Sequence, residues 1–74
     1  MVATDRAARV KAAAERVRLA HEHAERAHRR AAQLHAYAAL LFARHGKHEK
    51  AAAERAMADS QLEYAEKERA AGSR

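Results

Sequence analysis

A seven-residue repeat of apolar residues runs through the first half of the chain and strongly limits its fold. One row of the repeat is Ala3, Val10, Val17, Ala24, Ala31 and Ala38, and the other is Ala13, Ala20, Ala27, Leu34 and Leu41. We call the two rows together the Val/Leu stripe. Rows three and four residues apart share one face of an α-helix and correspond to the a and d positions of a coiled coil. The repeat therefore predicts one long helix that packs against other helices.

The composition supports an all-helical chain that cannot build a large core. The 74 residues include 23 alanines, two glycines and no proline, which favours helix almost throughout. Only 13 residues are larger apolar ones, and no cysteine is available for a disulfide. Because a short chain buries little surface and alanine adds little to it, we expect self-association to supply further stability.

Gly46 interrupts the helical pattern. It follows Arg44 and His45, and a glycine after a basic last turn is typical of a helix C-terminus. The apolar residues that follow it lie in a different phase, at Ala51, Ala58, Leu62 and Ala65. This change of phase predicts a bend at Gly46, although no Ser, Thr, Asp or Asn precedes Lys47 to cap a second helix.

The sequence thus predicts a single all-α domain over residues 1–74, a two-helix antiparallel hairpin. The long helix would span about 4–45, with Thr4 as its N-cap, and the shorter helix about 47–71. Folded back at Gly46, the shorter helix would reach only to about residues 18–22 of the long one. The first half of the Val/Leu stripe would then stay uncovered, which predicts a homodimer built as a four-helix or coiled-coil bundle.

The candidate interface residues are apolar side chains of both predicted helices, and the protein partner that we expect is a second copy. These residues are Val10, Val17, Ala24, Leu34, Leu41, Phe42, Ala58 and Leu62.

A metal site is an alternative function. His21, Glu25 and His28 have the i, i+3 and i+4 spacing that chelation within one helix needs. The E-x-x-H motif of residues 25–28 resembles that of the encapsulated ferritin-like proteins, short two-helix chains, and the resemblance implies iron or zinc bound across a dimer. Glu25 points away from the Val/Leu stripe, however. The alternative, which we favour, is a polar flank beside a coiled-coil seam, with no cofactor.

The histidine row suggests another hypothesis, a pH-sensitive assembly. His21, His28 and His35 recur every seven residues, and histidine titrates near neutral pH. If the rows of two chains faced each other, acid would place like charges on the interface.

A third function to consider is binding of nucleic acid. The chain carries a formal charge of +5, all of it within residues 1–45, and a basic half favours an anionic partner. The candidate phosphate contacts are Arg16, Arg18, Arg26, Arg29 and Arg30. Glutamates interrupt this basic surface and few aromatic residues are present to stack on bases, so a solvated helix exterior is the favoured alternative.

No enzyme motif is present, because Ser60 and Ser73 lack a triad context and no glycine-rich loop exists. We therefore predict no catalytic activity. The N-terminal residues do not form a signal peptide, and the longest uncharged apolar run, residues 36–43, is too short to span a membrane. These features predict a soluble, cytoplasmic protein.

Three further resemblances concern the hairpin itself. Residues 34–58 resemble a tetratricopeptide hairpin at Phe42, Gly46, Ala51 and Ala58, although one unit cannot form a solenoid. Tyr64 and Glu68 fit the Y-x-x-x-[DE] element of type VII secretion substrates, which leaves export by a similar route as an alternative, but the W-x-G of those proteins is missing. The whole chain resembles short Ala/Arg-rich helical-hairpin proteins of high-GC actinobacteria, and this resemblance implies no activity.

Overall fold

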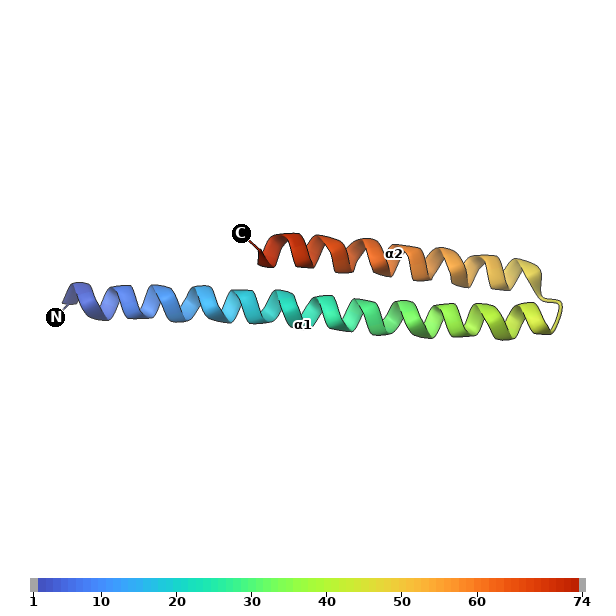
Figure 1. The fold of residues 1–74 in the computed structure, drawn as a ribbon, viewed down its shortest axis with the longest axis horizontal. Helices are drawn as coiled ribbons and strands as arrows, with labels where there is room; N and C mark the ends of the chain where they lie inside the picture. Colours follow the sequence, from blue (N-terminus) through green and yellow to red (C-terminus); the bar gives the residue numbers. More distant parts are fainter. Residues whose placement is uncertain (1, 74) are drawn as a thin grey trace.

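The chain folds as two antiparallel helices that lie side by side (Figure 1). The computed structural model describes residues 2–73, with side chains from residue 5 onward. Helix α1 (Val2–Arg44) and helix α2 (His48–Gly72) are its two elements, and neither contains an apolar stretch that would cross a membrane. The predicted antiparallel hairpin is confirmed. Helix α1 begins earlier than expected, so the backbone of Thr4 is already helical, and its side chain lies outside the described part.

The bend at Gly46 is a helix C-cap with a left-handed glycine. Gly46 has a φ of +72°, and among the described residues it alone has a positive φ. The N–H of Lys47 donates to the C=O of Phe42 at 2.8 Å, and the N–H of Gly46 donates to the C=O of Ala43 at 3.1 Å. These two hydrogen bonds form a Schellman motif, which satisfies carbonyls at the end of α1. Lys47 then precedes α2 without a side-chain cap hydrogen bond, as the sequence led us to expect.

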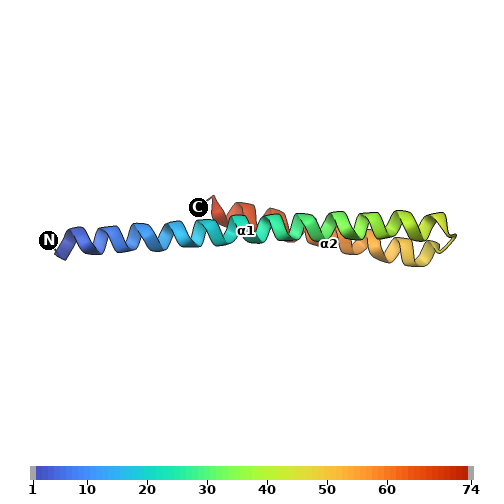
Figure 2. The ribbon, with the colours of Figure 1, turned by 90° about the horizontal axis from the view of Figure 1, so that it is seen from below.

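The contact between the helices is built around alanine. The buried apolar residues are Ala32, Ala39, Ala51, Ala58 and Ala65. Within each helix they are seven residues apart, so they form the repeating layers of an antiparallel coiled coil. Figure 2 shows α2 crossing α1 at a shallow angle, an arrangement that small side chains permit because the helix axes can approach closely. No larger side chain is buried among the described residues.

The Val/Leu stripe is not the face of α1 that contacts α2. The buried Ala32 and Ala39 each follow a stripe residue, Ala31 and Ala38, which are only half-buried. Consecutive residues of an α-helix point about 100° apart. Helix α1 therefore carries two separate faces, one occupied by α2 and the other, the Val/Leu stripe, about a quarter turn away.

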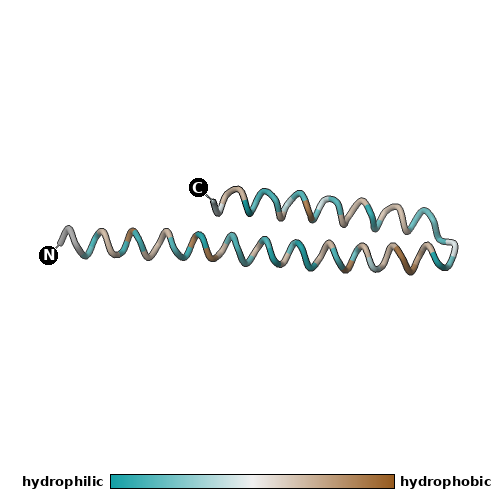
Figure 3. Tube along the Cα trace, in the orientation of Figure 1, coloured by the Kyte–Doolittle hydropathy of each residue, from teal (hydrophilic) through white to brown (hydrophobic). Residues whose placement is uncertain are grey.

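The first part of α1 extends beyond the end of α2 (Figure 1). A Cβ added to Gly72, the last residue of α2, would lie 3.2 Å from the Cβ of His21, so α2 ends beside that histidine. Residues 2–20, which we call the arm, extend for most of their length beyond α2, as the length mismatch predicted. Only the last turns of the arm, at Ala14, Val17 and Arg18, adjoin Ala71 and Gly72 at the end of α2. The hairpin is 68 Å long, and Figure 3 shows hydrophobic residues along α1, including the arm.

Replacing Gly46 with alanine should destabilise the hairpin. No heavy atom lies within 4 Å of a Cβ at this position, so the cost comes from the left-handed backbone, about 1–2 kcal/mol for a residue with a Cβ. Urea denaturation of Gly46→Ala at a fixed protein concentration should show this loss in the free energy of unfolding. Gly46→Asn, which tolerates the conformation better, should lose less. Equal stabilities of all three proteins would contradict the assignment.

Candidate functional site

Three histidines of α1 form a ladder of hydrogen bonds with α2. The Nδ1 atoms of His21, His28 and His35 lie 2.6, 2.7 and 2.5 Å from oxygens of Glu68, Gln61 and Glu54, respectively. Carboxylate and amide oxygens accept hydrogen bonds, so each Nδ1 donates. We call these three contacts the histidine ladder. Its residues lie between the alanine layers and are half-buried.

The histidine ladder fixes the register of the two helices. The three histidines and their three acceptors are each spaced by seven residues, in opposite directions along the hairpin. A slip of α2 by one heptad would leave a histidine and an acceptor without their partners. Alanine layers alone discriminate poorly between such registers because they are alike, and single polar residues in a seam are known to set register. Sequence reasoning did not identify Glu54, Gln61 and Glu68 as acceptors, although they recur every seven residues, as the histidines do.

The structure gives the histidine row a role within one chain, and a pH-sensitive assembly of two chains stays a prediction. His21, His28 and His35 point towards α2 of the same hairpin. Their partners within the hairpin are acidic or neutral. The histidine row therefore belongs to the contact that holds the hairpin together.

The candidate metal ligands have separate partners within the chain. His21 and His28 donate to α2, while Arg29 donates to the Glu25 carboxylate, with Nε and Oε2 3.0 Å apart. Among the described residues, no group of three or more His, Asp or Glu is placed to hold a metal ion. A metal shared between two chains stays a prediction, without support from this geometry.

The candidate phosphate-binding arginines fall into two groups. Arg18 forms ion pairs with Glu15 and Glu22, and Arg29 forms one with Glu25. The hydrogen bond from Arg18 lowers the pKa of Glu15, and the charge of Arg18 lowers it further. The other three arginines make no ion pair with the described residues; they are Arg16, Arg26 and Arg30. Binding of nucleic acid stays a prediction.

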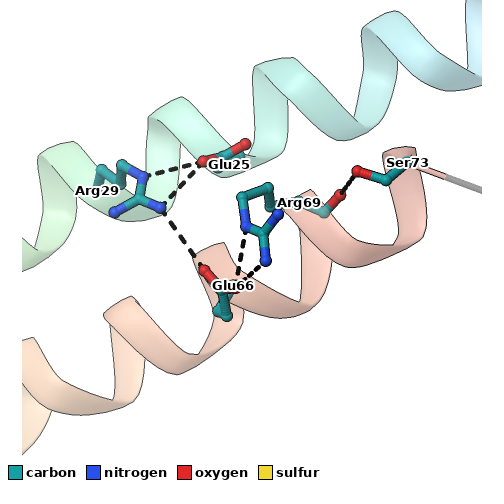
Figure 4. A network of polar contacts seen from close by, with 5 residues as sticks. All are labelled: Glu25, Arg29, Glu66, Arg69 and Ser73. Atoms are coloured by element: carbon teal, nitrogen blue, oxygen red, sulfur yellow. Dashed lines mark hydrogen bonds and ion pairs between the residues drawn. The ribbon is translucent and has the colours of Figure 1, made fainter.

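A small polar network connects the helices on one edge of the hairpin (Figure 4). Arg29 of α1 reaches both Glu25 and, at 3.9 Å, Glu66 of α2. Arg69 donates hydrogen bonds to Glu66 and thereby lowers the pKa of that carboxyl group, to which the charges of Arg69 and Arg29 also contribute. The network is exposed, and surface ion pairs contribute little to stability, so it orients side chains rather than holding the fold.

The Val/Leu stripe is an uncovered apolar face of α1. Its four large side chains are substantially exposed: Val10 by 64%, Val17 by 56%, Leu34 by 71% and Leu41 by 37%. The alanines between them are exposed or half-buried. From Val10 to Leu41 the stripe contains no charged residue. A contiguous exposed apolar surface of this kind is typical of an interaction site.

The predicted interface residues separate into three places. Val10, Val17, Ala24, Leu34 and Leu41 belong to the Val/Leu stripe. Phe42 and Ala58 instead serve the hairpin, since Ala58 is buried between the helices and the half-buried Phe42 ring lies 5.8 Å from the Lys50 Nζ at the turn. Leu62 lines a shallow open groove of about 410 Å³ on the side of Arg29.

Helix α2 adds apolar side chains beside the Val/Leu stripe. The ring of Tyr64 packs 5.4 Å from that of His28, and His28 neighbours the stripe residues Ala24 and Ala31 on α1. Met57 lies seven residues before Tyr64 and so shares its side of α2. Both are about half exposed. The stripe and these two residues therefore form one continuous face.

Comparisons with known proteins assign no family to this chain. No protein-family model matches it, and no match was found among curated proteins or solved structures. The resemblances noted in the sequence therefore stay predictions, and the function has to be inferred from the geometry.

The histidine ladder should contribute measurable coupling between the helices. In a double-mutant cycle of His35→Ala and Glu54→Ala, we expect a coupling free energy of about 1 kcal/mol, the net value of one partly buried hydrogen bond. Urea denaturation at a fixed protein concentration measures it. The control cycle pairs Glu54→Ala with His23→Ala, because His23 is exposed and makes no hydrogen bond to Glu54. Equal coupling in both cycles would contradict the ladder.

Proposed function

We propose that this protein is a non-enzymatic, self-associating helical hairpin that acts as a structural or interaction module. Two copies would dimerise into a bundle through the Val/Leu stripe. The observation that carries the proposal is the uncovered arm, whose Val10 and Val17 continue the same stripe as Leu34 and Leu41.

The weakness of the hairpin's own core supports the proposal. Alanines are the buried apolar residues of the described chain, and each methyl group contributes only about 0.8 kcal/mol when buried. Ten large apolar side chains in the described part of the chain remain exposed. Six of them lie in the Val/Leu stripe or on the adjoining side of α2, namely Val10, Val17, Leu34, Leu41, Met57 and Tyr64. A second copy would remove these side chains from water.

The isolated arm supports the proposal independently. Residues 2–20 form about 28 Å of helix, and only their last turns, at Ala14, Val17 and Arg18, adjoin the end of α2. An unpacked stretch of helix gains little stability in water, because most helical stability in proteins comes from packing of an apolar face. The Val/Leu stripe supplies such a face, and a second chain would give it a surface to pack against.

Leu34→Glu should disrupt self-association. Each dimer would lose two buried leucines, about 3 kcal/mol in total, which corresponds to a dissociation constant raised on the order of 100-fold. Sedimentation equilibrium measures this constant for the wild type and the variant, and native mass spectrometry of the untreated wild type reports the number of chains and any bound metal.

Leu40→Glu is the matched control. Leu40 is 59% exposed and lies outside the Val/Leu stripe, so this variant should associate as the wild type does. A monomeric wild type would overturn the proposed function. Equal weakening by both substitutions would show that the stripe is not the contact.

A further inference from the structure

We infer that two copies pair through their α1 helices in one antiparallel register, with the two-fold axis beside residues 25 and 26. This inference rests on the proposed self-association and specifies its geometry. It follows from the order of large and small residues along the Val/Leu stripe, which from Val10 to Leu41 is the same when read in either direction.

The stripe pairs with itself layer by layer in this register. Val10 lies opposite Leu41 of the second copy, and Val17 lies opposite Leu34. The other layers of the pairing, 13/38, 20/31 and 24/27, place alanine opposite alanine. From Val10 to Leu41, every large residue of the stripe thus faces another large one, and every small residue a small one. Layers of this kind, each formed by an a and a d position, are those of an antiparallel coiled coil.

Shifting the pairing by one heptad loses this match. If Val10 faced Leu34, then Val17 would face Ala27 and Leu41 would face Ala3. Large residues would then oppose alanines, while alanine pairs in the neighbouring layers hold the two helix axes close together. The mismatch leaves gaps in some layers or forces the helices apart. A shift in the other direction leaves Val10 beyond the end of the stripe, without an opposing residue.

The antiparallel register also covers both arms. A two-fold axis perpendicular to a pair of antiparallel helices keeps the two α2 helices on the same side of that pair. Each α2 lies along residues 21–44 of its own α1, and in this register those residues face residues 7–30 of the other copy. The side of α2 that bears Met57 and Tyr64 then flanks the other copy's arm. In a parallel pairing each arm would contact only the other arm, and no α2 helix would flank it.

The contact area reaches what a specific dimer needs. From Val10 to Leu41 the two helices would touch over about 48 Å, and a strip about 10 Å wide covers roughly 500 Å² on each copy. The total of about 1,000 Å² is at the lower limit for a specific interface. The flanking side of α2, with Met57 and Tyr64 half exposed, adds to this area.

Arginine rows beside the stripe oppose the pairing at low salt. Arg9 of one copy would lie near Arg44 of the other, and no acidic residue occurs in the row formed by residues 9, 16, 23, 30, 37 and 44. These side chains are exposed, and at about 0.15 M salt the charge interaction is screened beyond about 8 Å. The tests are therefore made at that ionic strength.

Disulfide trapping tests the register directly, because the natural chain has no cysteine. The double variant Val17→Cys/Leu34→Cys places cysteines in facing layers of the two copies, and within one helix these positions are too far apart to bond. After mild oxidation, non-reducing gel electrophoresis should show on the order of tenfold more covalent dimer than for either single variant. Circular dichroism and sedimentation of the reduced protein confirm that it is helical and dimeric.

Two further variants complete the test, one as an out-of-register control and one as a second facing pair. Val10→Cys/Leu34→Cys puts the cysteines of different copies about one heptad, or 10 Å, out of register, too far for a disulfide. If the first double variant does not dimerise, Ala20→Cys/Ala31→Cys tests a neighbouring facing layer and keeps all the large residues.

The outcomes separate the register from the proposed function. Cross-links in the 17/34 or 20/31 variants but not in the 10/34 variant support the inference. Equal cross-linking by a single-cysteine variant such as Val17→Cys indicates a parallel pair and overturns it, as does a dimer that none of the facing pairs traps. A wild type that sediments as a monomer rejects self-association itself.

Discussion

Close packing of alanine against alanine is the constraint on which the rest of this structure depends. Ala32 and Ala39 of α1 meet the alanines of α2 in heptad layers, and their methyl groups allow the two helix axes to approach closely. The same choice leaves the hairpin without a large buried side chain. The apolar residues that an ordinary core would contain lie instead on a second face of α1, and that face needs a partner from outside the hairpin.

The histidine ladder supplies the specificity that alanine layers lack. Successive alanine layers are nearly equivalent, so α2 could slide by a heptad at little cost in packing. The contacts of His21, His28 and His35 with their acceptors penalise such a slip, because a half-buried donor or acceptor would lose its hydrogen bond. Apolar layers thus bring the helices together, and polar layers between them decide how they align.

Sequence reasoning predicted the hairpin, the bend at Gly46 and the end of α2 near residue 21, because helix propensity, a left-handed glycine and helix length are local properties. It was wrong about the face of α1 that contacts α2, because it expected α2 to cover the second half of the Val/Leu stripe. The Val/Leu stripe is the more apolar face, yet α2 packs against the face of Ala32 and Ala39. That choice depends on matching two helices at once, including the spacing of Glu54, Gln61 and Glu68, which no single helix reveals.

Hydrogen exchange of the arm amides over a range of protein concentrations tests the central claim most directly. If a second copy covers the arm, the amides of residues 5–20 should exchange slowly above the dissociation constant of the dimer and rapidly below it. Amides of the turn at residues 45–47 serve as the internal reference. Arm amides that exchange equally fast at every concentration, including those where sedimentation shows a dimer, would contradict this account.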